Sequence, residues 1–62
     1  MKIFVNGAEI NLHEGSVVSD ALKKVGINSE TVLVKRRGEL VAEIERLQEN
    51  DILETISVIS GG

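Results

Sequence analysis

The hydrophobic pattern opens with two short alternating segments on either side of Asn6-Gly7. Lys2 to Val5 is mainly apolar and β-branched, and Ala8 to Leu12 alternates, with Ile10 and Leu12 on one face. An Asn-Gly pair between such segments favours a type I′ turn, because both central residues of that turn need positive φ. The pattern predicts that the chain begins with an antiparallel β-hairpin.

The next segment has the period of a helix. Apolar residues recur at i, i+3, i+4 and i+7, at Val18, Ala21, Leu22 and Val25. This stripe predicts a helix over about residues 17–25. We expect Ser16 to cap its first turn, because a serine hydroxyl accepts from the free backbone N–H groups there. Gly26 stands at the natural end, where a left-handed residue is needed.

Strands are predicted after the helix over 31–36 and 52–59, with residues 39–44 as a short strand or extended segment and residues 45–51 as a loop or single helical turn. The order is β-β-α-β-β-β, and the fold class is α+β. One helix must pack across one face of a mixed sheet of four to five strands, because no other element can bury that face. With the first and last strands parallel at the centre, this is a β-grasp roll. We expect residues 1–59 to form a single domain and residues 60–62 a flexible tail.

Composition excludes several classes of function. The 62 residues contain no cysteine, so a disulfide scaffold, a cysteine nucleophile and a thiolate metal site are all excluded. The net charge of −3 and the single aromatic residue, Phe4, argue against nucleic acid as a partner. No apolar run approaches the length of a membrane span, and the first residues lack a signal-peptide layout. We expect a cytoplasmic protein that is monomeric when free.

Residues that could carry catalysis lack partners. His13 is the only histidine, and a loop histidine of this kind is usually solvated. The serines show no nucleophile-elbow pattern, and the carboxylates do not form a metal-ligand pattern. The basic residues Lys35, Arg36, Arg37 and Arg46 could meet an acidic partner surface, but we expect them to be solvated, as a turn rich in charge usually is. No histidine or second ligand set accompanies the acidic residues, which are Glu39, Glu43, Glu45, Glu49, Asp51 and Glu54. The sequence therefore predicts neither an enzyme nor a metal site.

The C-terminal pair Gly61-Gly62 follows directly on the last predicted strand, and we expect it to be the working end of the protein. Glycines can thread a narrow channel because they lack Cβ and accept almost any φ and ψ. An activating enzyme could then use ATP to convert the Gly62 carboxylate into an acyl-adenylate. A sulfur nucleophile would leave a thiocarboxylate, and a lysine amine would leave an isopeptide. Three hypotheses follow: a carrier, a protein modifier conjugated to lysines, or a plain binding domain with an incidental Gly-Gly.

Strand parity suggests a docking surface. In the first strand Ile3 and Val5 are the better core pair, which turns Phe4 outward. In the last strand the residues alone leave two choices. One set holds Ile52, Glu54, Ile56 and Val58, and the other holds Leu53, Thr55, Ser57 and Ile59. The first set is more apolar, but burying it would also bury Glu54 at a large cost if that carboxylate is unpaired.

Four motifs occur in order along the chain: the opening strand with Asn6-Gly7, the segment 15–18 leading into the helix, the segment 47–51, and the ending Val58-Ile59-Ser60-Gly61-Gly62. Together they resemble those of the ThiS/MoaD family of ubiquitin-like sulfur carriers, over essentially the whole chain. The family usually has Gly-Asp before the last strand. Here the pair is Asn50-Asp51, and asparagine also tolerates the left-handed conformation.

The resemblance implies adenylation of Gly62 by a ThiF/MoeB-type activating enzyme and its conversion to a thiocarboxylate. ATP and magnesium would belong to that enzyme, so no cofactor is expected on this chain. The sulfur would pass to a thiazole synthase (thiamin), the large subunit of molybdopterin synthase, or an enzyme of the tRNA thiolase type. Archaeal and eukaryotic relatives are also attached to lysines. The short chain favours the ThiS side of the family.

The resemblance also places Leu53 and Thr55 inside the fold. Ile56 and Val58 would then point outward beside Phe4 and Leu33, forming an apolar patch that binds a partner. We expect the partner-binding residues to be Phe4, Leu33, Ile56, Val58, Ile59 and Ser60, with Gly61 and Gly62 as the activated C-terminus.

Overall fold

The computed structural model describes residues 1–58. Its elements are β1 (Lys2–Val5), β2 (Ala8–Asn11), α1 (Val18–Val25), the short 3₁₀ helix η1 (Ser29–Thr31), β3 (Val32–Arg36), β4 (Glu39–Val41) and β5 (Ile52–Ser57). The predicted order is confirmed, but the third and last strands are shorter than predicted, because Thr31 belongs to η1 and β5 ends at Ser57, before Val58. Of the predicted strand or extended segment 39–44, only Glu39–Val41 forms a strand. Ile59 and the predicted tail lie outside the described residues.

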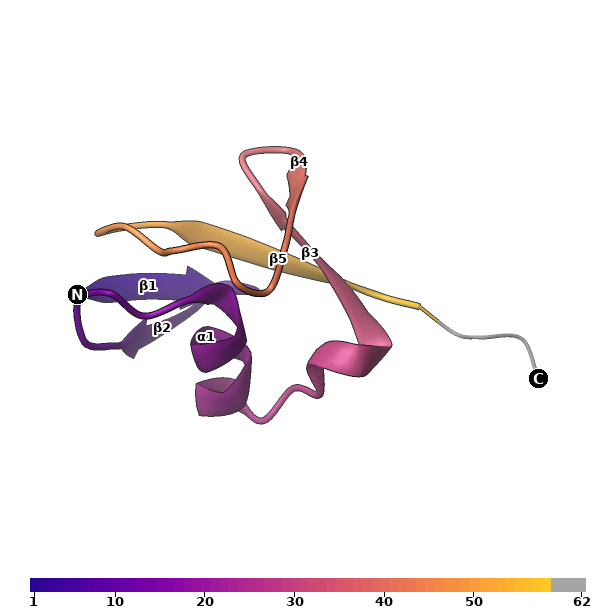
Figure 1. Cartoon of the computed structure of the whole chain (residues 1–62), viewed down its shortest axis with the longest axis horizontal. Coiled ribbons are helices and arrows are strands. Elements are labelled where there is room, and N and C mark those ends of the chain that lie inside the picture. The colour runs from indigo at the N-terminus through magenta and orange to yellow at the C-terminus, as the bar shows by residue number, and fades with distance from the viewer. Residues whose placement is uncertain (59–62) are drawn as a thin grey trace.

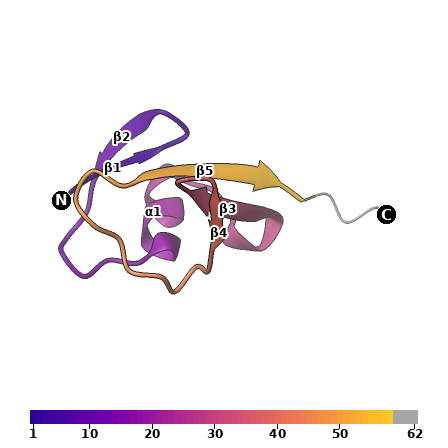
Figure 2. The same cartoon turned by 90° about the horizontal axis from the view of Figure 1, so that it is seen from above.

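The five strands form one mixed sheet in the order β2-β1-β5-β3-β4. β1 is antiparallel to β2 and parallel to β5, and β3 is antiparallel to both β5 and β4. β5 is therefore the middle strand, and it runs along the long axis of the molecule (Figure 1). α1 lies on one face of the sheet, as Figure 2 shows. This is the predicted β-grasp arrangement.

The core lies between α1 and the inward faces of the central strands. Ile3, Leu22 and Leu53 are at most 1% exposed. The remaining buried apolar residues are Val5, Val18, Ala21, Val34 and Leu47. Full burial of a large aliphatic side chain contributes about 1.5–3 kcal/mol. The alternation of these residues along β1, β3 and β5 decides which sheet face turns toward α1 and which is left for solvent.

The two turns predicted from glycine are confirmed, whereas the predicted helix cap is not. Asn6 and Gly7 have φ of 50° and 86°, as a type I′ turn requires, and Gly26 ends α1 with φ of 79°. Ser16 does not cap α1. The Asp20 carboxylate accepts from the Val17 N–H at 2.9 Å and closes the first turn from inside the helix.

The loop between β4 and β5 is tied to α1 and to the sheet. The Val18 N–H donates to the Glu45 carbonyl at 3.0 Å, which attaches the loop to the start of α1. Arg36 on β3 donates to the Arg46 carbonyl at 3.1 Å and to Asp51 Oδ2 at 3.2 Å. Arg36 thus pairs with Asp51, which is only 5% exposed, so the expectation that Arg36 is merely solvated is wrong. Their pairing holds the loop in place immediately before β5 begins.

Candidate functional site

The outward face of β5 is apolar near the C-terminus. Leu53 is fully buried, whereas Ile56 is 45% and Val58 is 49% exposed. The inward placement of Leu53 and the outward placement of Ile56 and Val58 are therefore confirmed. Glu54, which belongs to the outward set, is exposed. Its carboxylate therefore avoids the free-energy cost of burial that the opposite parity would have imposed.

Three exposed apolar side chains meet at the end of the described chain. Leu33 on β3 is directly opposite Ile56 on β5, and Leu33 is 47% exposed. The Val58 N–H donates to the Thr31 carbonyl at 2.9 Å, so the backbone is still attached to its neighbour at this point. We call Leu33, Ile56 and Val58 the tail-side patch, because β5 leads from it into residues 59–62. A cluster of this kind needs an explanation such as partner binding.

Phe4 does not join the tail-side patch. Its neighbour on β5 is Ile52, which lies four residues before Ile56, a distance of about 13 Å along a strand. Phe4 is half-buried, and the Lys2 ammonium lies 5.9 Å from the centre of its ring. The prediction that Phe4 lies beside Ile56 is thus wrong, because strand register places it near the start of β5. Ile52, 59% exposed, is its actual apolar neighbour.

A charged row separates the two apolar regions of the outward face. Lys35 on β3 is directly opposite Glu54 on β5. Both residues belong to the outward parity of their strands, between the Leu33–Ile56 pair and the end of the sheet that carries Ile52. A partner at the tail-side patch would therefore meet this charged row before reaching Phe4.

Asn6 and Thr55 form a contact that sequence reasoning missed. Asn6 Nδ2 donates to Thr55 Oγ1 at 2.8 Å, and the Thr55 N–H donates to Asn6 Oδ1 at 2.9 Å. The side-chain amide of Asn6 thereby continues the pairing of β1 with β5, in the position where the backbone of a further β1 residue would otherwise bond to Thr55. The Asn-Gly turn signal could have identified Asn6, but not its partner on β5.

Four predicted site residues, Ile59, Ser60, Gly61 and Gly62, lie outside the described residues. Their assignments as partner-binding residues and as the activated C-terminus stay predictions. The structure shows the position of the strand that precedes them. β5 is the middle strand, paired with β1 at its start and with β3 throughout.

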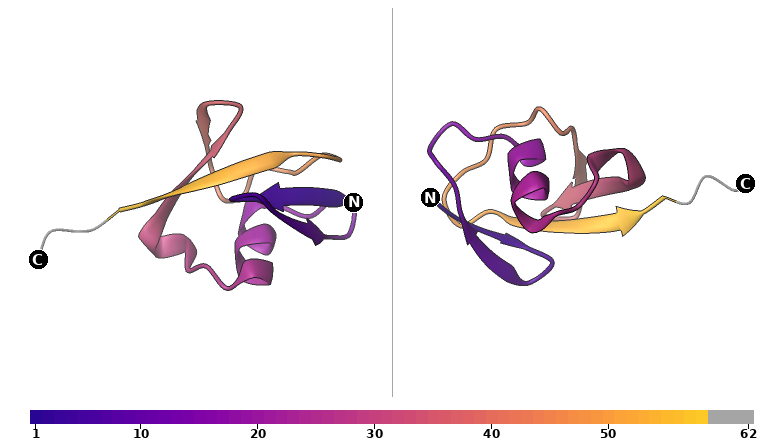
Figure 3. Two further views of the ribbon diagram at one scale, coloured as in Figure 1. Left: turned by 180° about the vertical axis from the view of Figure 1, so that it is seen from behind. Right: turned by 90° about the horizontal axis from the view of Figure 1, so that it is seen from below.

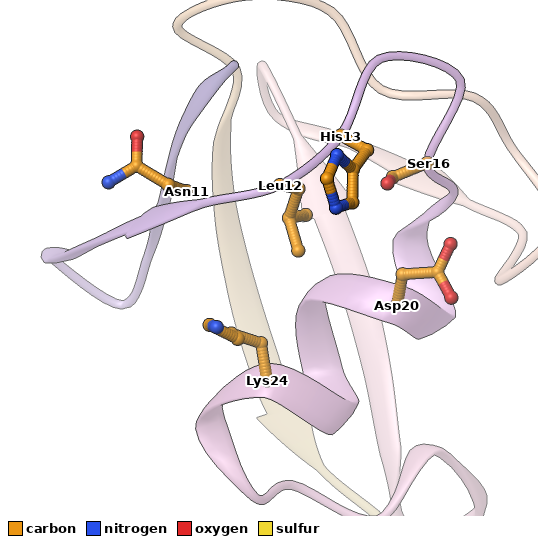
Figure 4. A pocket seen from close by; sticks show the side chains of 6 residues that line it. All are labelled: Asn11, Leu12, His13, Ser16, Asp20 and Lys24. Carbon is orange, nitrogen blue, oxygen red and sulfur yellow. The ribbon is translucent and has the colours of Figure 1, made fainter.

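A separate surface groove of about 460 Å³ lies between the end of β2 and α1. Figure 4 shows its lining residues, which are Asn11, Leu12, His13, Ser16, Asp20 and Lys24. His13 is exposed, and the Asp20 carboxylate is engaged by the Val17 N–H, so these side chains do not converge as a catalytic set. Over residues 1–58, no group of three or more potential metal ligands is found. No helix in that same range is long and apolar enough to cross a membrane.

The fold and the site define a small ubiquitin-like protein of the β-grasp class, whose middle strand leads into its C-terminal residues. The chain belongs to the ThiS family, whose family model matches residues 2–62. Proteins of this family are small carriers and not catalysts, so the chain is not an enzyme.

Individual relatives agree with this assignment. The sulfur carrier protein TtuB of Thermus thermophilus is 35% identical over 54 residues, which cover 87% of this chain and 83% of TtuB. The crystal structure of the thiamine biosynthesis protein ThiS from Geobacter metallireducens matches with a TM-score of 0.73 and 23% identity, over 100% of both chains. SAMP1 from Haloferax volcanii matches with a TM-score of 0.69 and 20% identity, over 98% of this chain and 97% of SAMP1. At these identities the two structures support the fold alone.

Proposed function

We propose that this chain is a sulfur carrier whose Gly62 carboxylate is adenylated by a ThiF/MoeB-type enzyme and converted to a thiocarboxylate. The observation that carries the proposal is the position of β5. It is the middle strand of the sheet, and it leads past an exposed apolar patch toward Gly61-Gly62. Membership of the ThiS family and similarity to a sulfur carrier protein support the same conclusion.

The proposed chemistry needs only a carboxylate from this chain. A Gly62 carboxylate oxygen attacks the α-phosphate of ATP, and the bond to pyrophosphate breaks. Hydrosulfide, or an enzyme-bound equivalent, then attacks the acyl carbon, and AMP leaves with the original oxygen. The enzyme supplies ATP, magnesium and the positioning of the reactants. The role of the chain is to present Gly62, and its glycines suit a channel too narrow for a Cβ.

The tail-side patch is the surface we propose for docking of the activating enzyme. It lies at the C-terminal end of β5, so an enzyme that binds Gly62 must pass close to it. Exposed apolar side chains there contribute binding energy without adding a charge that the enzyme would have to neutralise. Sulfur would then pass to a thiazole synthase, the large subunit of molybdopterin synthase or an enzyme of the tRNA thiolase type, in the cytoplasm.

ATP–pyrophosphate exchange with the host's activating enzymes tests the proposal, using the full chain and a matched chain without Gly62. We expect exchange with the full chain and none with the shortened one. Intact mass after adding a sulfur donor then identifies the product, because a thiocarboxylate has one oxygen replaced by sulfur, whereas a modifier gives isopeptide-linked conjugates. Absence of exchange with every candidate enzyme would refute the carrier hypothesis.

A further inference from the structure

β5 loses its neighbour on one side before it ends. The last backbone bond from the β1 side is from the Asn6 N–H to the Leu53 carbonyl, at 2.9 Å. The Asn6 side chain then caps Thr55, and the chain turns through Gly7 into β2, on the far side of β1. Figure 3 shows β5 continuing beyond the tip of the β1–β2 hairpin. Along that part of its length β5 is accompanied by β3 alone.

The backbone groups freed by this turn can be assigned. The Val58 N–H donates to the carbonyl of Thr31, just before β3, and the Leu53 carbonyl accepts from the Asn6 N–H. The backbone N–H and C=O groups of even-numbered residues in this segment therefore point toward β3. Those of odd-numbered residues point toward the β1 side. The N–H and C=O of one strand residue point to the same side, and successive residues alternate. The Thr55 carbonyl and both backbone groups of Ser57 therefore face the side that β1 has left. Among residues 1–58, no backbone group pairs with them.

An open strand edge is a template for another strand. Natural edges are usually protected by charged side chains, proline or a bulge. The residues here are Thr55 and Ser57, which are small and uncharged, and the chain has no proline. β2 and β4, the outer edges of the sheet, are short and carry the exposed residues Glu9 and Glu39. The open edge of β5 is thus the least protected of the three.

We infer that this edge, from Thr55 to Ser57, accepts an extended segment of the enzyme that activates Gly62, which adds a strand in line with β1. The inference rests on the proposed function. Gly62 is the fifth residue after Ser57, so the enzyme's catalytic centre lies within about 17 Å of the edge. A strand paired here would hold the base of the tail extended. Backbone bonds would supply affinity while the tail-side patch supplies side-chain contacts.

The enzyme is a better occupant than a second copy of the chain. Two copies would pair only about three residues on each side, and each copy carries a net charge of −3. Strand pairs of that length are marginal without further buried surface. The enzyme, in contrast, has a reason to lie at this position, because it must bind residues that follow directly on β5.

A proline variant with a matched control tests the edge. Ser57→Pro removes the free N–H while leaving the β3 ladder intact, because that ladder uses the even-numbered residues. Ser57→Ala removes the hydroxyl but keeps the N–H. We expect Ser57→Pro to raise the KM for the carrier in ATP–pyrophosphate exchange about tenfold, and Ser57→Ala to leave it unchanged. Circular dichroism and urea unfolding establish that both variants are folded.

Amide hydrogen exchange on the wild-type chain tests the edge without substitution. We expect the Ser57 N–H to exchange fast in the free carrier and to become protected on adding the enzyme without ATP. The Thr55 N–H, bonded to Asn6, should be protected in both states and serves as the internal control.

The outcomes separate the two proposals. Suppose that loss of Gly62 abolishes ATP–pyrophosphate exchange while Ser57→Pro behaves as wild type and the Ser57 N–H stays unprotected. The edge inference is then overturned and the carrier function stands. If the wild type shows no ATP–pyrophosphate exchange with any enzyme, the carrier function and the edge inference are both refuted. Protection of the Ser57 N–H that rises with carrier concentration alone would assign the edge to a second copy and overturn the inference.

Discussion

Asn6 and Thr55, 49 residues apart, are joined by two hydrogen bonds that close the parallel pairing of the first and last strands. Asn6 is suited to this position in two ways. It tolerates its φ of 50°, and its amide carries both a donor and an acceptor, like a peptide group. The same residue therefore makes the hairpin turn and decides where β5 becomes free on one side.

Two substitutions separate these contributions of Asn6. Asn6→Gly keeps the positive φ but loses both bonds, and we expect it to lower the free energy of unfolding by about 1–2 kcal/mol. Asn6→Ala also adds left-handed strain, and should cost about 1 kcal/mol more. Urea unfolding measures both values. Equal stability of the three proteins would show that neither the bonds nor the turn geometry matters.

The tail-side patch is tested by a pair of variants on one face of β5. Ile56→Arg should raise the KM of the activating enzyme for the carrier about tenfold or more, because it places a charge opposite Leu33 in the proposed interface. Ile52→Arg adds the same charge four residues away, beside Phe4, and should change the KM little. Surface changes of this kind should leave stability within about 0.5 kcal/mol. Equal kinetic effects of the two variants would contradict the position of the patch.

The inward parity of β5 makes a stability prediction. Leu53→Ala should cost about 2–5 kcal/mol, since it opens a cavity against the helix, whereas Ile52→Ala on the opposite face should cost less than about 0.5 kcal/mol. A domain of this size has a total stability of only about 3–9 kcal/mol, so Leu53→Ala should lower the urea midpoint sharply. A larger loss with Ile52→Ala would mean that the parity is reversed.

The pairing of Arg36 with buried Asp51 predicts unequal effects at neighbouring arginines. Arg36→Met leaves the Asp51 carboxylate buried without its cationic partner, and we expect a loss of about 2–4 kcal/mol. The Gln48 N–H, which donates to Asp51 Oδ2 at 2.8 Å, would remain as a partial compensation. Arg37→Met removes the same charge from an exposed residue and should change stability by less than about 0.5 kcal/mol. Urea unfolding measures the stability of the two variants. Similar losses of unfolding free energy would show that the Arg36–Asp51 pair does not stabilise the fold.

The order of elements could be predicted from the sequence because each signal is local. The Asn6-Gly7 turn, the helical stripe from Val18 to Val25 and the terminating Gly26 depend on backbone geometry within a few residues. The prediction that Ser16 caps the helix was wrong, because a different side chain accepts a hydrogen bond at the start of the helix. Asp20, one turn into the helix, reaches the Val17 N–H.

The candidate site could be predicted only in part, because it depends on which strands become neighbours. Alternation along β5 left two parities open, and only the family resemblance chose between them before the structure confirmed the choice. Register between β1 and β5 then placed Phe4 beside Ile52 and away from Ile56. No local pattern contains that register, since it is set by packing of the whole sheet against α1.

The sequence by itself therefore determined the elements, the class of fold and the Gly61-Gly62 ending, because these follow from periodicity, turn chemistry and residue identity. The tertiary structure alone decided the separation of Phe4 from the tail-side patch, the Arg36–Asp51 pair and the open edge beside Thr55 and Ser57. Each of these depends on contacts between residues distant in sequence. Such contacts arise from the packing and pairing of whole strands, which the residues of one strand do not specify.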